Sequence, residues 1–234
     1  MDSREAGCGL LEALREKNSV PIYEASSPRF AIYGKVVEGY DFTEMIRYMN
    51  KKTTVPEEGN QYLASVPELE AMETAGRVQR GIYGGMPVQV GYCNGRNTTC
   101  NGFEYHKGSE INIAASDFML ILGHTWDIKN NSYHVDQSEV FLVRQGMAVE
   151  MYQTTLHLSP CTVSREGFRD IVILPGGTNT PLEYRPEAYT EEDRLLLMKN
   201  KWMLAHPDRE LLILQGAHPG VLGENLELFY LESR

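Results

Sequence analysis

Hydrophobic positions in the first third of the chain follow a helical period, interrupted by one extended run. Apolar residues three and four apart predict an amphipathic helix over residues 4–17. Residues 29–37 (RFAIYGKVV) are typical of a strand. Asp41 then precedes an amphipathic stretch, so residues 42–52 are expected to form a helix with Asp41 near its N-terminus. A further short helix is predicted around residues 67–72.

The pattern changes near residue 77, where short apolar or alternating runs begin to recur between turn signals. They continue to about residue 174 and read GIYGG, PVQVGYC, FEYHKGSEINIA, FMLILG, EVFLV, AVEMYQTTLHLS and DIVILP. Many short strands at this spacing predict a β-sandwich or β-barrel. The fold class is therefore expected to be mainly β.

The last quarter returns to a helical pattern. Residues 191–206 (EEDRLLLMKNKWMLAH) are expected to form a helix that ends before a proline. We interpret the chain as one domain, residues 1–234. It would consist of an N-terminal helical and strand extension over residues 1–76, a β-barrel core over residues 77–182 and a C-terminal helical segment over residues 183–234.

Composition narrows the classes of protein that fit. The 234 residues are 42% hydrophobic, enough for one sizeable core. A net charge of −10 argues against a surface that binds nucleic acid. The longest apolar runs, FMLILG and ELLILQ, are far shorter than the roughly 20 residues of a membrane helix. No signal-peptide pattern is visible at the N-terminus, so we expect a cytoplasmic protein without nucleic-acid or membrane partners.

One segment, GFEYHKGSEINIA, carries ionisable residues at even positions. If the segment is extended, Glu104, His106 and Glu110 emerge on one face. His157, in the later run GMAVEMYQTTLHLSPC, could join them from a neighbouring strand. Two imidazoles and one or two carboxylates suit Zn, Mn, Fe, Ni or Co without choosing among them. The competing interpretation is the solvated face of an antiparallel sheet, which is polar by default.

The spacing of these residues resembles the two cupin motifs. HKGSE gives a histidine and a glutamate with three residues between them, and Gly146 lies eleven residues before His157. Glu104 stands where the first motif has another histidine, which leaves the fourth metal ligand open. The phrases YCNGRNTTCNGFEYHKGSEINIA, TTLHLSPC, LPGGTNTPL and KNKWMLAHPD also resemble an uncharacterised bacterial family of cupin-like proteins.

The resemblance implies a cupin double-stranded β-helix, or jelly-roll barrel, with a divalent metal ion inside and helices at both ends. It implies His106, Glu110 and His157 as metal ligands. Glu104 would be either the fourth ligand or the catalytic base, and it cannot be both in one state. Gln89 and Glu139, on other predicted core strands, are candidate substrate-binding residues, although each could equally face outward.

Small cupins with such ligands resemble sugar isomerases, so the leading hypothesis is a metal-dependent isomerase or epimerase of a small sugar or sugar acid. RFAIYGKVV and the strand ending at His157 are also similar to ureidoglycolate lyase, which is the second hypothesis. The third is a sugar-binding cupin without turnover. By analogy with cupins that pair through edge strands, a homodimer is the expected assembly.

Overall fold

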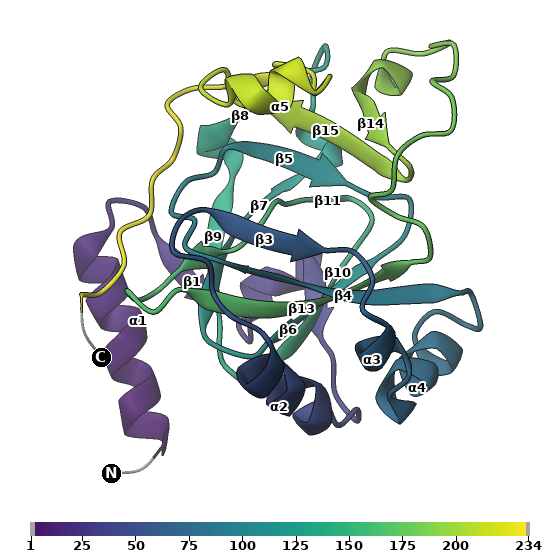
Figure 1. The fold of residues 1–234 in the computed structure, drawn as a ribbon. Helices are drawn as coiled ribbons and strands as arrows, with labels where there is room; N and C mark the ends of the chain where they lie inside the picture. Colours follow the sequence, from purple (N-terminus) through teal and green to yellow (C-terminus); the bar gives the residue numbers. More distant parts are fainter. Residues whose placement is uncertain (1–2, 233–234) are drawn as a thin grey trace.

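Two β-sheets that face each other form the centre of the protein (Figure 1). The structure is a computed structural model, and it describes residues 3–232. Within that range the larger sheet has six strands in the spatial order β2-β10-β6-β13-β4-β3. Their bounds are β2 Gly34–Val36, β10 Ala148–Met151, β6 Glu110–Ala114, β13 Phe168–Pro175, β4 Val88–Gly95 and β3 Asn60–Leu63.

The second sheet is smaller and faces the first. It contains β1, β9, β7 and β11 in that spatial order, with β12 also paired to β7. The bounds are β1 Ile22–Glu24, β9 Glu139–Val143, β7 Phe118–His124, β11 Thr155–Leu156 and β12 Cys161–Thr162. β1 runs parallel to β9, and the other pairings of this sheet are antiparallel. These sheets confirm the mainly β fold that the short apolar runs predict.

A buried apolar cluster holds the two sheets together. The larger sheet contributes Cys93, Val149 and Val172, and the smaller sheet contributes Leu120 and Phe141. Because side chains alternate across a strand, the neighbours of these residues point away from this interior. Each sheet therefore needs a second apolar layer on its outer face.

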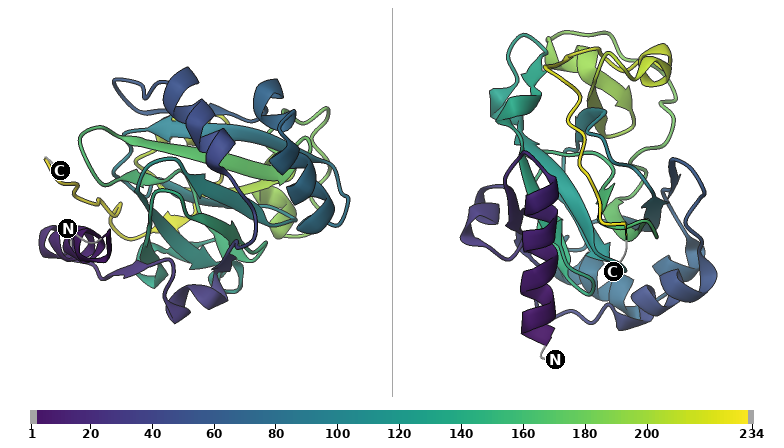
Figure 2. Two further views of the ribbon diagram at one scale, coloured as in Figure 1. Left: turned by 90° about the horizontal axis from the view of Figure 1, so that it is seen from below. Right: turned by 90° about the vertical axis from the view of Figure 1, so that its left-hand side faces the viewer.

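Helices and the chain ends supply those outer layers. The larger sheet is covered by α2 (Thr43–Lys52), α3 (Pro67–Glu70) and α4 (Glu73–Gly81). Full burial of an apolar side chain such as Met45 of α2 stabilises the fold by roughly 1.5–3 kcal/mol. The smaller sheet is covered by α1 (Ser3–Lys17), which lies along it in the right-hand view of Figure 2.

The C-terminal tail lies beside α1 (Figure 1). The Asn18 side chain donates to the Phe229 carbonyl at 2.9 Å and accepts from the Phe229 amide at 2.8 Å. This pair of bonds fixes the tail against the smaller sheet.

A small third sheet lies at one end of the facing sheets, above β3 and β11 in Figure 1. It has the order β14-β15-β5, with bounds β14 Leu196–Met198, β15 Lys201–Ala205 and β5 Gly102–Tyr105. β16 (Val221–Leu222) pairs with β8 (Tyr133–His134) nearby, and α5 (Glu210–Leu214) follows β15. This end of the fold holds the candidate site.

The helix predicted over residues 191–206 is wrong. A short 3-10 helix, η4 (Glu192–Leu195), leads into the β14-β15 hairpin, with Asn200 at the turn at φ 55°. β15 pairs with β5, and Trp202 stacks on Tyr105 with ring centroids 5.8 Å apart. These tertiary contacts override the helical spacing of the leucines. The C-terminal segment is therefore mostly hairpin and loop, and α5 is the only α-helix among its described residues.

Other local predictions have mixed outcomes. The helices expected at residues 4–17, 42–52 and 67–72 are confirmed as α1, α2 and α3, and the Asp41 carboxylate accepts from the Thr43 amide at 2.9 Å. The strand expected over residues 29–37 is wrong in its first half, which is a 3-10 helix, η1 (Pro28–Ile32). α4 was not predicted, and GIYGG, expected to be a strand, is the end of α4 followed by a turn.

No helix within residues 3–232 is both long enough and apolar enough to cross a membrane.

Candidate metal centre

A tight turn, rather than one extended strand, brings His106 and Glu110 together. β5 ends at Tyr105 and β6 begins at Glu110, and the two strands belong to different sheets. Gly108 lies in the turn at φ 152°, where a Cβ atom would lie 2.8 Å from Pro175 Cγ. The expectation of a single strand with one polar face is therefore wrong. The Glu110 Oε2 and His106 Nε2 atoms lie 3.3 Å apart across the turn.

His157 reaches the same point through backbone pairing with Glu104. The Glu104 amide donates to the His157 carbonyl at 2.6 Å, and the His157 amide donates to the Glu104 carbonyl at 3.0 Å. Directly opposed residues in such an antiparallel bridge project their side chains to the same side. His157, which directly follows β11, is thereby placed beside β5.

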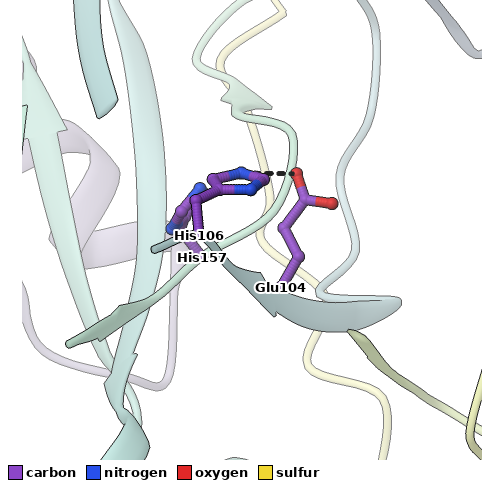
Figure 3. A group of neighbouring side chains, drawn as sticks. All are labelled: Glu104, His106 and His157. Atoms are coloured by element: carbon purple, nitrogen blue, oxygen red, sulfur yellow. Dashed lines mark ion pairs between the residues drawn. The ribbon is translucent and has the colours of Figure 1, made fainter. Parts of the chain in front are cut away.

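The ligand atoms of four residues converge in a buried cluster. Glu110 Oε2 lies 3.2 Å from His157 Nε2 and 3.3 Å from His106 Nε2. Glu104 Oε1 lies 3.9 Å from His106 Nε2. One ligand atom each from Glu104, His106 and His157 lies within 4.8 Å of the others, and Figure 3 shows these three side chains pointing toward one another. All four residues are buried.

Both imidazoles are oriented by backbone carbonyls. His106 Nδ1 lies 2.7 Å from the Asn200 carbonyl oxygen, and His157 Nδ1 lies 2.9 Å from the Thr155 carbonyl oxygen. A carbonyl oxygen only accepts, so each Nδ1 carries the hydrogen and donates it. In the neutral ring, Nε2 then carries the lone pair, which is how outer partners orient metal-binding histidines. His106 Nε2 has no hydrogen-bond partner among the described residues.

A lysine from the hairpin balances part of the negative charge. Lys201 Nζ forms an ion pair with Glu104 Oε2, and the two side chains are 15% and 10% exposed. Burial raises the pKa of Glu104, but Lys201 and the two histidines outweigh it and hold the pKa below its usual value. Glu104 is therefore ionised at neutral pH.

Glu110 and His157 shift each other in opposite directions. Burial raises the pKa of Glu110, yet His157 and His106 lower it well below its ordinary range. Burial lowers the pKa of His157, and the Glu110 carboxylate, helped by Glu104 and the Thr155 carbonyl, raises it to about 9. In the metal-free protein, a proton on the imidazoles thus compensates the charge of Glu110. A bound cation could replace that proton.

A cavity of about 330 Å³ opens beside the cluster, a size at the lower end of small-molecule sites. Glu104 and Glu110 lie in its wall together with Lys201. The other polar lining residues are Asn60, Tyr62, Asn97, Asn101, Asn112, Ser159, Asp170, Asn179 and Arg209. A space with so many amide, hydroxyl and charged groups suits a small polar molecule.

The donor set fits a divalent metal ion. Two imidazole nitrogen atoms, once the rings are neutral, and at least one ionised carboxylate are ligands shared by Zn, Mn, Fe, Ni and Co sites. His106 Nε2 is buried, has no hydrogen bond among the described residues and lies 3.3 Å from Glu110 Oε2, so a cation would satisfy both atoms. The buried group therefore suggests a divalent metal, and its chemistry leaves the element open.

The two candidate substrate-binding residues do not line this cavity. Gln89 donates to the Thr178 carbonyl at 2.9 Å and accepts from the Gly177 amide at 2.7 Å, which fixes the loop after β13. Glu139 forms an ion pair with Arg29 and accepts from the Tyr33 hydroxyl at 3.1 Å. Both side chains are occupied with structural contacts away from the cluster.

The remaining histidines also lie outside the cluster. His124 is stacked between Tyr33 and Trp126, with ring centroids 4.2 and 4.0 Å apart. His206 was expected at a helix C-terminus, but it follows β15 and its Nε2 contacts the Gly223 carbonyl oxygen at 3.0 Å. Neither ring has a carboxylate arrangement like that of the cluster.

Sequence reasoning missed most polar residues of the cavity, and three of them lie near the cluster or on its strands. Lys201 lies within the segment predicted to be a helix, and only the hairpin directs it toward Glu104. Asn112 donates to Glu110 Oε1 at 2.7 Å. Asp170, on β13, is 1% exposed. An acidic residue inside an otherwise apolar strand, as in FRDIVILP, is a signal that could have pointed to Asp170.

The chain belongs to a family described as a domain of unknown function, DUF4867, whose model matches residues 22–226. The comparison with curated proteins found no match. The family membership agrees with the resemblance to an uncharacterised family that the sequence phrases indicate.

Among solved structures, the chain is partly similar to two cupins. For oxalate decarboxylase from Bacillus subtilis, one comparison gives a TM-score of 0.30 and 9% identity, covering 53% of this chain and 27% of that chain. For vicilin from hazelnut, Corylus avellana, the TM-score is 0.33 and the identity 6%, covering 68% of this chain and 38% of that chain. The chain thus spans about a quarter to two fifths of these proteins. Likeness at this level carries no information on ligands or activity.

Proposed function

We propose that the protein is a metal-dependent isomerase or epimerase that acts on a small sugar or sugar acid. The observation that supports this most directly is the convergence of His106, His157 and two glutamates at one buried point beside a polar cavity. In the proposal His106, His157 and Glu110 hold a divalent ion, and the substrate occupies the cavity.

The cavity lining favours a polyhydroxylated ligand. Asparagine side chains both donate and accept, so Asn60, Asn112 and Asn179 match hydroxyl groups. Arg209 also lines the cavity and offers a cation to the carboxylate of a sugar acid. A purely apolar ligand would leave a lining atom that has no partner among the described residues, such as Asn179 Oδ1, unsatisfied, which costs about 1–3 kcal/mol for each such buried atom.

When bound, a divalent cation would polarise a substrate carbonyl or hydroxyl group and favour loss of a proton from the adjacent carbon. The residues of the chain have separate tasks. His106 and His157 keep Nε2 directed at the shared point because their Nδ1 atoms are anchored on carbonyls. Lys201 keeps Glu104 ionised, which either role of that carboxylate requires.

Glu104 has two mutually exclusive roles, and one variant separates them. As a fourth ligand, Glu104 binds the cation through its carboxylate. As the base, it takes the proton from one carbon and returns it to the next. Glu104→Gln would lower metal affinity in the first case. In the second case the variant would keep its metal and lose turnover.

The function is tested by proton exchange. Metal-loaded protein is incubated in deuterium oxide with a panel of aldoses, ketoses and uronates, and NMR follows deuterium entering the carbon next to the carbonyl. An isomerase or epimerase incorporates deuterium into at least one sugar, and His157→Ala does not. Stoichiometric metal without exchange into any sugar would contradict the proposal. Release of urea and glyoxylate from ureidoglycolate would instead support the lyase hypothesis.

A further inference from the structure

Asp170 is a buried acid whose side chain has no partner. It lies on β13, is 1% exposed and lines the cavity that adjoins the metal cluster. Neither carboxyl oxygen has a hydrogen-bond partner among the described residues. Buried polar groups are almost always hydrogen-bonded, so a group of this kind calls for an explanation.

Strand register places Asp170 close to the cluster but beyond contact with it. On β6, Asn112 pairs with Val172, and the next inward residue, Ala114, pairs with Asp170. Asp170 and Asn112 are therefore diagonal neighbours on one face, about 7–8 Å apart. Asn112 donates to Glu110 at 2.7 Å, and Asp170 lies one row of side chains beyond Asn112 and two rows beyond Glu110. A ligand bound at the cluster would have to extend by a few carbon atoms to reach Asp170.

The surroundings of Asp170 favour a neutral partner. The residues paired with it, Cys93 and Ala114, belong to the apolar cluster between the sheets and supply no side-chain oxygen for a second cation. Burial and the charge of Glu110 raise the pKa of Asp170 well above its ordinary value, and only the Ile113 backbone opposes this. A protonated carboxyl group donates one hydrogen bond and accepts another, as a hydroxyl group does.

We propose that Asp170 is the specificity-determining residue of the cavity and hydrogen-bonds a substrate hydroxyl group remote from the metal-bound end. The inference rests on the proposed function and adds to it a requirement on the substrate. The substrate carries a hydroxyl group, and not a carboxylate, at the end that reaches Asp170, while the carboxylate of a sugar acid lies toward Arg209. A site built to bond a hydroxyl group rejects analogues that lack it.

The test couples one side chain to one hydroxyl group. Metal-loaded wild type, Asp170→Leu and Asp170→Asn are titrated by calorimetry with the tightest-binding pentose or uronate of the panel and with each of its monodeoxy analogues. Leucine has nearly the shape of aspartate without polar atoms, and asparagine restores a donor and an acceptor. Metal content and unfolding temperature are measured for each variant, because replacing an unpartnered buried carboxyl group by an apolar one is not expected to prevent folding.

We expect one monodeoxy analogue to bind wild type about tenfold or more weakly than the parent sugar, and Asp170→Leu to bind both equally. Asp170→Asn should recover most of the discrimination. Discrimination that is the same in wild type and Asp170→Leu would overturn the inference and leave the proposed function standing. Failure of the metal-loaded wild type to bind any sugar of the panel would overturn both.

Discussion

The backbones of Glu104 and His157 exchange two hydrogen bonds, with N···O distances of 2.6 and 3.0 Å. This bridge joins the chain after β11 to β5, so two candidate ligands 53 positions apart in the sequence share one piece of backbone geometry. Neither side chain can shift along its strand without breaking the bonds of the other. The bridge therefore preorganises the cluster before any cation arrives.

Removing either imidazole should abolish stoichiometric metal binding. His106→Ala and His157→Ala each remove one of two nitrogen ligands. Loss of a residue that only hydrogen-bonds a metal ligand lowers affinity by about 10- to 100-fold, so loss of a ligand itself should lower it by at least about 100-fold. The measurement is metal content after dialysis against Zn²⁺ or Mn²⁺ and desalting. His134→Ala, a change of an exposed histidine on β8, is the matched control. Equal metal content in all three variants would rule the cluster out as the metal site.

The two site residues that are joined by a short turn could be predicted from the sequence. His106 and Glu110 lie at the two ends of the tight turn between β5 and β6, and their separation by three residues is a local property that is readable without the fold. The eleven-residue interval between Gly146 and His157 also indicated that His157 joins them. In the structure Gly146 lies in a turn at φ 86°. The structure brings these residues together, although the reason is a turn and a bridge rather than one extended strand.

Residues that depend on tertiary pairing could not be predicted. Leu196–Met198 and Lys201–Ala205 have apolar spacing that fits a helix, and only pairing of β15 with β5 makes them strands. Because a helix was predicted in place of the hairpin, the position of Lys201 beside Glu104 could not be predicted. The inward direction of Asp170 likewise depends on its register with β4 and β6.

Metal binding should strengthen with rising pH. The pKa of His157 is raised to about 9, so below that pH a proton must leave before the ring can bind a cation. Apparent metal affinity should then fall by up to about tenfold for each pH unit below 9. Titrations with Zn²⁺ or Mn²⁺ would measure this dependence. They should run from about pH 6.5, the pKa of a free histidine, to about pH 9, the raised pKa of His157. An affinity independent of pH would contradict this prediction.

The metal-free protein should respond to pH in the opposite direction. A raised folded-state pKa means that the imidazolium of His157 stabilises the fold below its unfolded value of about 6.5. That contribution is lost as pH rises toward 9, at up to about 1.4 kcal/mol per pH unit. Chemical unfolding with a chelator present should therefore show declining stability over this window, and added metal should reverse the trend.

Lys201 should be needed for stability chiefly when metal is absent. Lys201→Met leaves the buried Glu104 carboxylate without its cation, and breaking a buried ion pair in this way costs about 3–5 kcal/mol. A cation bound at the cluster would compensate part of the loss. Unfolding free energies with and without metal measure both effects. Lys199→Met, a change of an exposed lysine on the same hairpin, should cost little in either condition.

Asn200 should control the orientation of His106. Its carbonyl accepts from His106 Nδ1, its side-chain oxygen accepts from the Lys107 amide at 2.8 Å, and its φ is 55°. Asn200→Ala places a residue that disfavours this conformation there, at a cost of about 1–2 kcal/mol, and should weaken metal binding about 10- to 100-fold. Asn200→Gly retains the conformation and should bind metal more tightly than Asn200→Ala. The reverse order of affinities would show that backbone conformation is unimportant for the site.

Asp170→Asn should make the protein more stable, and increasingly so as pH rises. Burial and Glu110 raise the folded-state pKa of Asp170 well above the value of about 3.9 in an unfolded chain. Above pH 3.9 or so the unfolded chain has lost this proton while the folded protein keeps it, which costs wild type about 1.4 kcal/mol per pH unit until the folded-state value is reached. Asparagine has no proton to lose, so the two proteins should differ little in stability at acidic pH and diverge toward neutrality.

Chemical unfolding at fixed metal concentration measures the difference in stability, with Asp136→Asn, at an exposed aspartate, as the control. A difference that does not grow with pH would mean that Asp170 is not held protonated. A difference that does grow would mean that the fold carries a costly carboxyl group in its interior, as expected for a residue retained for ligand recognition rather than stability.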